Sequence, residues 1–329
     1  MTYRILALDG GGIKGCFTAG VLAALEKNTG CRCVDHFDMI AGTSTGGIIA
    51  IGLGLGLSAA EIVEFYENHG PRIFPSTSLA RRWTGVVRHL FQPKHSHEIL
   101  RSALTEVFRQ RKFGESLRPL VIPTYDANSG RIFLLKTAHH KHLRYDYDAP
   151  AVEVALATAA ALTYFAAAKF PNHDNNSYVD GGVWANSPAL AAIVETVHFL
   201  GKPLEEIDVL SIGTTSVPFN VAKKHGSGIL GWNSGLVEIL MSAQQEAANA
   251  QAMLLVNRRF HRIDHKAPRG QFSLDDARPK QIERLVSLGR GEAVKKDNIA
   301  VIRERFLNGQ HAPRFKPVHC VDRRPSRST

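Results

Sequence analysis

The sequence has few cysteines and no apolar run long enough to cross a membrane. Only four of its 329 residues are cysteine, too few for a disulfide framework, so we expect a reducing compartment, the cytoplasm. The longest apolar stretch, residues 48–57, falls far short of the roughly 20 residues that a spanning helix needs. The N-terminus shows no basic region or cleavage site of a signal peptide. These absences argue against a secreted miniprotein and an integral membrane protein.

Acidic residues are outnumbered, 30 against 40 Lys and Arg, which gives a formal net charge of +10. This charge favours an anionic partner such as a bilayer surface. The basic residues are scattered except at residues 323–327, so no DNA or RNA partner is predicted. No Gly/Ser-rich linker divides the chain. We therefore expect one domain over residues 1–312 and a short basic tail over 313–329.

Short apolar runs alternate with helical patterns along the chain. The runs that predict strands are residues 4–8, 37–40, 120–123 and 207–211, and the patterns that predict helices include 16–27, 46–57 and about 236–256. Ser58 and Glu61 form a capping box, which predicts a helix that ends near Asn68. Strands interleaved with helices predict an α/β fold of three layers, α/β/α, with a mostly parallel central sheet.

Two segments, about residues 71–97 and 219–235, have the composition of lid-like insertions. In the first, apolar residues recur at helical spacing over 79–91, with Trp83 and Phe91 among them and Arg81 and Arg82 between them. This segment is either a lid over an apolar channel or a surface helix that enters the lipid headgroup region. The second contains Lys223, Lys224 and several glycines, which predicts a loop before the long helix.

A glycine-rich turn, DGGGIKG at residues 9–15, lies between the first predicted strand and helix. Consecutive glycines allow backbone amides to point inward, and the helix N-terminus adds positive potential, so the turn favours an anion. Lys14 and Gly15 are candidate contacts to it. The letters also fit a dinucleotide fingerprint, but the second strand lacks the terminal acid that would bind a ribose.

A second motif, GTSTGG at residues 42–47, follows the second predicted strand. Small residues on both sides of Ser44 permit the strained turn between strand and helix that exposes a nucleophilic hydroxyl. Because loops after neighbouring parallel strands lie together, we expect the amides of Gly10, Gly11 and Gly12 beside Ser44, where they can bind an oxyanion.

A third motif, DGGVWANSP, begins at Asp180. An acid before two glycines leaves its carboxylate accessible, as a general base requires. On this motif alone, a plain Asp-Gly turn is the simpler interpretation. The combination with the other two motifs favours a catalytic acid.

The three motifs together resemble those of the patatin-like phospholipases, which are serine acyl hydrolases. This resemblance implies that Ser44 is the nucleophile, Asp180 its base and Gly10 to Gly12 the oxyanion hole, with Lys14 where the family usually has arginine. It implies no cofactor and no metal. Departures at Leu162, Ala166, Ala167 and Ser187 concern the shape of the acyl channel.

The resemblance further implies a phospholipid membrane as partner, approached from the cytoplasm at the inner membrane. The chain is similar to phospholipase effectors of bacterial anti-phage systems, which cyclic di- or trinucleotides activate, and such effectors allow a homodimer or an activated oligomer. A contrasting hypothesis is a nucleotide-binding sensor without hydrolase activity, in which the glycine-rich turn binds phosphate. The histidines at 139, 140 and 142 form no metal-ligand pattern and predict a solvated loop.

Overall fold

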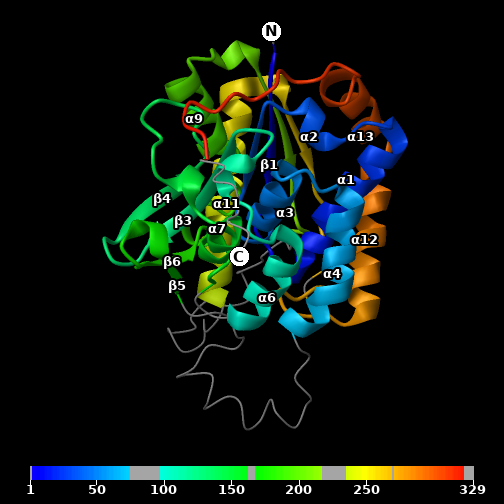
Figure 1. Ribbon diagram of the computed structural model, residues 1–329. Coiled ribbons are helices and arrows are strands. Elements are labelled where there is room, and N and C mark those ends of the chain that lie inside the picture. Colours follow the sequence, from blue (N-terminus) through cyan, green and yellow to red (C-terminus); the bar gives the residue numbers. More distant parts are fainter. Residues whose placement is uncertain (1, 75–96, 162–166, 217–234, 269, 322–329) are drawn as a thin grey trace, which may run out of the picture.

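The computed structural model describes residues 2–74, 97–161, 167–216, 235–268 and 270–321, and it is an α/β fold of three layers (Figure 1). A mostly parallel sheet lies between two layers of helices, which confirms the predicted fold class. The possible lid residues Arg81, Arg82, Trp83 and Phe91 lie outside the described residues, as do Lys223 and Lys224.

The sheet has eight strands in the described part of the chain, in the order β5-β6-β3-β2-β1-β7-β8, with β4 paired to β3. Strands β1, β2, β3, β7 and β8 are parallel, whereas β4, β5 and β6 join antiparallel at one side. The strands are β1 (Tyr3–Leu8), β2 (Met39–Gly42), β3 (Leu120–Asp126), β4 (Arg131–Lys136), β5 (Ala168–Phe170), β6 (Asn176–Asp180), β7 (Ile207–Ile212) and β8 (Phe260–Ile263).

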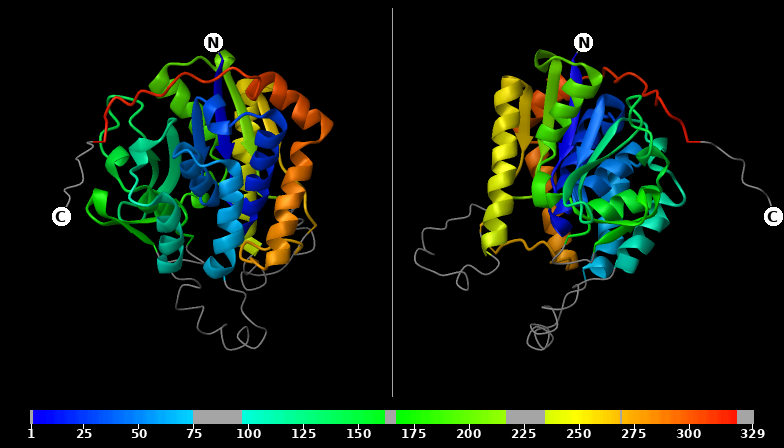
Figure 2. Two further views of the ribbon diagram at one scale, coloured as in Figure 1. Left: turned by 45° about the vertical axis from the view of Figure 1, so that its right-hand side comes forward. Right: turned by 90° about the vertical axis from the view of Figure 1, so that its left-hand side faces the viewer.

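Helices cover both faces of this sheet, as the two turned views in Figure 2 show. Helices α9 and α11 cover one face, and the larger group around α1, α3, α4 and α12 covers the other. The helices are α1 (Gly15–Thr29), α2 (Cys33–His36), α3 (Thr45–Gly54), α4 (Ala59–Ile73), α6 (His97–Phe108), α7 (Ala151–Thr158), α8 (Gly182–Ala185), α9 (Ala189–Leu200), α11 (Gly235–Val256), α12 (Pro279–Ala293) and α13 (Lys296–Val301).

The central strand β1 shows why the sheet is buried on both sides. Its residues alternate between the two faces, so Leu6 and Leu8 join the core beneath α1 and α3, while Ile5 and Ala7 join the core beneath α9 and α11. All four side chains are fully buried. An uninterrupted apolar run is therefore the expected sequence of this strand.

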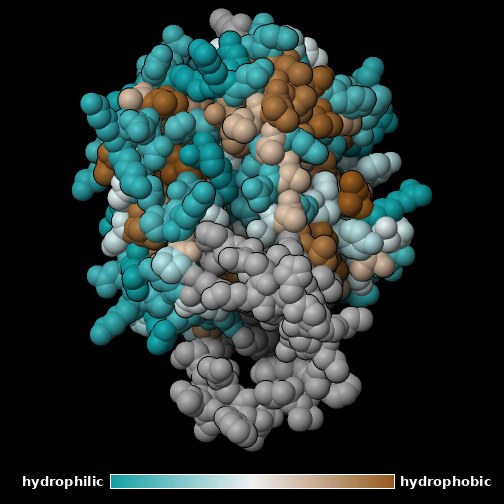
Figure 3. All heavy atoms as spheres, turned by 180° about the vertical axis from the view of Figure 1, so that it is seen from behind, coloured by the Kyte–Doolittle hydropathy of each residue, from teal (hydrophilic) through white to brown (hydrophobic). Residues whose placement is uncertain are grey.

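Helix α11 is partly exposed on the back of the molecule. Figure 3 shows apolar side chains among polar ones on that face, and those of α11 that are exposed include Leu240, Met253 and Leu254. Within the described ranges, none of the helices combines the length and apolar character that a bilayer span requires.

The predicted capping box is present at the start of α4. The Ser58 hydroxyl accepts a hydrogen bond from the Glu61 amide at 3.2 Å, and the Glu61 carboxylate accepts one from the Ser58 amide at 2.8 Å. The helix continues to Ile73, five residues beyond the predicted end at Asn68. Residues 71–73, which composition assigned to the first insertion, form its last turn.

The C-terminal residues 307–321 run across the outside of the domain and are held by two buried arginines. Arg4 donates to the carbonyl of Phe306, just before this segment, and to that of Gln310, and Arg118 donates to the carbonyls of Ala312 and Pro313. Further along, the Val318 amide donates to the carbonyl of Ala138 at 2.7 Å. The first residues of the expected basic tail thus lie against the domain.

Candidate active site

The glycine-rich turn follows β1 and passes directly beside Ser44. A Cβ atom placed on Gly10 would lie 2.4 Å from Asn186 Oδ1 and 3.2 Å from the Cβ of Ser44, so a larger residue would displace the side chains around it. A Cβ atom on Gly11 would lie 2.2 Å from the Thr214 hydroxyl oxygen, and Gly12 has a φ of +57°. The turn therefore needs glycine for close approach and for backbone conformation. The predicted juxtaposition of the two loops is confirmed.

The amides of this turn differ from the expectation at two positions. The Gly10 amide donates to the Asn186 carbonyl at 3.0 Å, which removes it from the expected oxyanion hole. The Gly15 amide donates within its own helical turn, to Gly12 and Ile13, so it is not an anion contact. The amides of Gly11 and Gly12 have no acceptor in the part of the chain that the structure describes. Of the three amides predicted to bind an oxyanion, these two are therefore the ones left to donate.

Ser44 lies on a strained turn between β2 and α3. Its φ of 54° and ψ of −122° fall in a region that side-chain-bearing residues rarely adopt. Gly46 makes the turn sterically possible, because a Cβ atom there would lie 2.2 Å from the Leu8 carbonyl oxygen. The Ser44 amide donates to the Thr158 hydroxyl at 3.0 Å, and this hydroxyl donates to the Pro123 carbonyl at 2.7 Å. These contacts hold the turn in place.

Strands β2 and β6 bring Ser44 and Asp180 together. Strand β4 pairs with β3 over residues 121–126, so β2 and β6 share the other edge of β3. Ala41 of β2 lies opposite Val121, and Asp180 at the end of β6 lies opposite Thr124. Since β6 runs antiparallel to β2, the two strands meet with their carboxyl ends facing.

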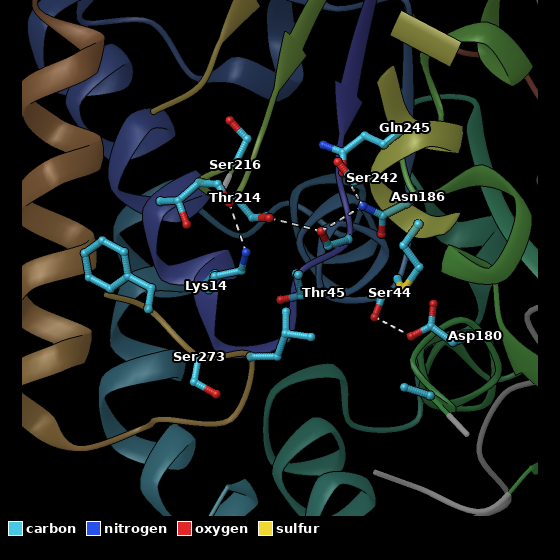
Figure 4. Close-up of a pocket in the computed structure, with 18 of the residues that line it drawn as sticks. Lys14, Ser44, Thr45, Asp180, Asn186, Thr214, Ser216, Ser242, Gln245 and Ser273 are labelled. Carbon is cyan, nitrogen blue, oxygen red and sulfur yellow. Dashed lines mark hydrogen bonds between the residues drawn. The ribbon is translucent and has the colours of Figure 1, made fainter. Parts of the chain in front are cut away.

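The Ser44 hydroxyl donates to Asp180 Oδ2 at 2.6 Å (Figure 4). The other carboxylate oxygen accepts from the Gly182 amide at 2.7 Å. Asp180 is only 6% exposed, and burial raises the pKa of its carboxyl from 3.8 to about 6, partly opposed by these two hydrogen bonds. The carboxylate is thus a stronger base than an exposed aspartate and is aimed at the serine proton.

Asp9, the residue before the glycines, is fully buried and binds two side chains from the second half of the chain. Its Oδ2 accepts from Arg262 Nη2 at 2.6 Å and from Gln245 Nε2 at 2.7 Å. Burial raises the pKa of Asp9, and the Arg262 guanidinium opposes that rise. Arg262 also donates to Ser211 and Asp264, so it joins the ends of β1, β7 and β8.

Helix α11 supplies contacts that the sequence motifs did not indicate. Gln245 Oε1 accepts from Asn186 Nδ2 at 2.8 Å, Gln244 Oε1 accepts from the Asn186 amide at 3.3 Å, and Asn249 Oδ1 accepts from the Ser187 hydroxyl at 2.7 Å. Polar residues on a helix are ordinarily solvated, so the sequence gave little reason to expect these contacts. The one available sign was the spacing of Gln244, Gln245 and Asn249, which lie one and four residues apart on the helix.

Ser44 and Asp180 line a pocket of about 1130 Å³. One part of its lining is apolar and comes from α3, α4, the residue that follows α4, and α6, and another part is polar and comes from the glycine-rich turn and the ends of β7 and β8. The apolar side chains include Ile48, Phe65, Ile73, Phe74 and Leu100, and the polar ones include Lys14, Thr215, Ser216, Asp264 and Lys266. The pocket around Ser44 and Asp180 therefore presents both apolar and polar surface.

Lys14 belongs to the polar part of this lining. Its ammonium donates to the Thr215 carbonyl at 2.9 Å, and burial lowers the pKa of this lysine. The Thr215 hydroxyl beside it is buried and has no partner in the described residues. This corner therefore holds an ammonium beside a buried hydroxyl that has no partner among the described residues.

The histidines at 139–142 do not form a metal site. His139 is buried and lies 2.9 Å from the Glu195 carboxylate, which Lys136 also binds at 2.8 Å. The expectation of a solvated loop is therefore wrong for His139. Across the described ranges, no group of three or more His, Cys, Asp or Glu side chains is arranged to hold a metal ion.

Residues 6–193 match the family described as patatin-like phospholipase. The chain belongs to this family. As a patatin-like phospholipase, it is a lipid acyl hydrolase, which excludes the hypothesis of a sensor without hydrolase activity. Its glycine turn, its GTSTGG turn and Asp180 all fall within the matched residues.

Curated relatives cover most of this patatin-like phospholipase. It is 36% identical over 269 residues to a cGAMP-activated phospholipase of Pseudomonas aeruginosa (strain BWHPSA011 / Pa011), which covers 81% of this chain and 79% of that protein. A cGAMP-activated phospholipase of Vibrio cholerae is 31% identical, over 87% of this chain and 89% of that protein. Patatin-like protein 1 of Arabidopsis thaliana is 29% identical, over 87% and 80%.

Proposed function

We propose that this protein hydrolyses the fatty-acyl esters of membrane phospholipids through a Ser44–Asp180 dyad. The observation that carries the proposal is the 2.6 Å hydrogen bond from the Ser44 hydroxyl to a buried carboxylate of raised pKa. Ser44 is the nucleophile and Asp180 its general base, with no histidine between them.

The reaction has two acyl-transfer steps. Asp180 accepts the hydroxyl proton while Ser44 Oγ attacks the ester carbonyl, and the resulting oxyanion is bound by the amides of Gly11 and Gly12. The tetrahedral intermediate collapses, the alcohol leaves with the proton from Asp180, and water then hydrolyses the acyl-enzyme by the same route. Donors of this kind contribute about 3 kcal/mol each to transition-state stabilisation.

The two parts of the pocket lining suit the two ends of a phospholipid. The apolar residues from α3, α4 and α6 would bury an acyl chain, and the polar corner at Lys14 would face the phosphate. The Lys14 ammonium, whose pKa burial lowers, has three N–H donors. One of them binds the Thr215 carbonyl, so two remain for a phosphate oxygen.

Activation by a cyclic nucleotide is the second part of the proposal. Two relatives that cover most of this chain are named cGAMP-activated phospholipases. We assign this chain a cyclic di- or trinucleotide activator, a cytoplasmic location and attachment to the inner membrane when active, as a dimer or larger oligomer. The net charge of +10 favours an anionic bilayer.

The test is release of free fatty acid from mixed phospholipid vesicles by the parent, Ser44→Ala and Asp180→Ala proteins, with and without cGAMP. We expect release by the parent only, increased by cGAMP, and labelling of Ser44 by a fluorophosphonate. Full turnover by folded Asp180→Ala would refute the dyad. Equal release with and without cGAMP would refute activation by cGAMP, and equal release with a panel of other cyclic di- and trinucleotides would refute the activator altogether.

A further inference from the structure

Gln245 on α11 joins the two loops that carry the proposed catalytic groups. Its amide nitrogen donates to Asp9 Oδ2 at 2.7 Å, and its amide oxygen accepts from Asn186 Nδ2 at 2.8 Å. Asp9 immediately precedes the glycine-rich turn, and Asn186 lies six residues after Asp180. Figure 4 shows Gln245 and Asn186 side by side near Ser44.

Asn186 is itself fixed to the glycine-rich turn. Its carbonyl accepts from the Gly10 amide at 3.0 Å, and its side-chain nitrogen lies 3.4 Å from the Gly10 carbonyl. One continuous set of hydrogen bonds, Asp9 to Gln245 to Asn186 to Gly10, therefore links the glycine-rich turn to the loop after Asp180. Thr214, which donates to the Gly10 carbonyl at 3.0 Å, and Arg262 hold the same turn from the ends of β7 and β8.

We propose that Gln245 is a positioning residue that holds the glycine-rich turn at the correct distance from the Ser44–Asp180 pair. This inference rests on the proposed function. An oxyanion donor that moves by about 1 Å loses much of its effect on the transition state, up to roughly 100-fold in rate. Gln245 lines the pocket, but both of its hydrogen bonds go to Asp9 and Asn186, so we expect its loss to change the chemical step more than the binding of a small ester.

A purely structural role would be to keep α11 on the sheet, but other contacts of α11 do that. Ala252 and Val256 are buried in the core under α9. Asn249 accepts a hydrogen bond from the Ser187 hydroxyl, and Gln244 accepts one from the Asn186 amide. Loss of the Gln245 amide leaves these contacts in place, so the helix stays seated when the positioning contact is removed.

The experiment compares Gln245→Met, which keeps length and loses both hydrogen bonds, with Gln251→Met, an exposed residue of the same helix. The substrate is p-nitrophenyl butyrate, with cGAMP present, and kcat, KM and melting temperature are measured separately. We expect Gln245→Met to lower kcat 10- to 100-fold with KM within twofold and the melting temperature within 4 °C. Gln251→Met should match the parent.

A second variant, Gln245→Glu, keeps the shape and the acceptor to Asn186 but places a carboxylate against Asp9. We expect a larger loss of kcat than in Gln245→Met at pH 7.5, because like charges separate the two loops. Parent-like kcat in both variants, with Ser44→Ala inactive, would overturn the positioning role and leave the proposed function intact. An inactive parent whose Ser44 resists fluorophosphonate would instead overturn the proposed function.

Discussion

Asp180 must be ionised to accept a proton, yet its burial favours the neutral acid. The balance raises the pKa of the carboxyl to about 6, so it is mostly ionised at neutral pH while remaining more basic than an exposed aspartate. We expect kcat/KM for a soluble ester to rise through a single ionisation near pH 6. A profile from pH 4.5 to 8 measures this, and a midpoint near pH 4 would contradict it.

The same burial costs stability. Because the folded-state pKa lies above the unfolded value of 3.8, the folded protein binds more protons between about pH 4 and 6, and its stability falls as pH rises through that window. Asp180→Asn should therefore stabilise the fold at pH 7 by about 1–3 kcal/mol while abolishing activity. Urea denaturation at pH 7 and pH 4 tests this, and the gain should be absent at the lower pH.

Sequence motifs predicted Ser44 and Asp180 because three glycine-containing motifs occur together in one chain, whereas the Asp180 motif alone favoured a plain turn. They did not predict Thr158, Gln245 or Arg262. These residues act through hydrogen bonds to positions more than 100 residues away, and a threonine or glutamine in a helix carries no local sign of such a contact. The hydrogen bond from the Gly10 amide to the Asn186 carbonyl could not be predicted for the same reason, because the two residues are far apart in the sequence.

At the scale of helices, α1 and α12 pack closely because each offers a glycine to the other. A Cβ atom on Gly20 would lie 2.4 Å from the Val286 carbonyl oxygen, and one on Gly289 would lie 2.1 Å from that of Phe17. Neither backbone oxygen can move aside without shifting its helix. Gly291, two residues further along α12, has nothing within 4 Å of such an atom.

This contrast gives a matched pair of substitutions. Gly289→Ala should lower the free energy of unfolding by about 2–3 kcal/mol through overpacking, whereas Gly291→Ala should raise it by about 0.5–1 kcal/mol because alanine favours the helix. Chemical denaturation of both variants measures the difference. Equal stability of the two would show that the helices separate at little cost.

Four strands, β1, β2, β3 and β7, were predicted from uninterrupted apolar runs, because both of their faces are buried. Strands β4, β5, β6 and β8 were not. Strand β4 consists largely of exposed or half-buried residues, and strands β5, β6 and β8 are only three to five residues long. The antiparallel side of the sheet, which orients Asp180 toward Ser44, thus arises from segments with weak local patterns.

At the scale of the whole molecule, Arg118 fastens the C-terminal segment to the domain. Its guanidinium donates to the carbonyls of Val34 and Asp35 in addition to those of Ala312 and Pro313. Arg118→Met should cost about 3 kcal/mol of stability, because several buried carbonyls lose their donors. It should also expose residues 312–321 to proteases. Arg303→Met, at a more exposed arginine, should cost less than about 1 kcal/mol.

The path of the chain through the sheet also bears on biosynthesis. A nascent chain of 193 residues already contains Ser44 and Asp180, but Gln245, Arg262 and the Leu274 carbonyl, which accepts from the Ile13 amide at 3.0 Å, have not yet been translated. The glycine-rich turn therefore takes its final form only when the last quarter of the protein has left the ribosome. A nascent chain that stops before these residues lacks three of the groups that hold the glycine-rich turn beside Ser44.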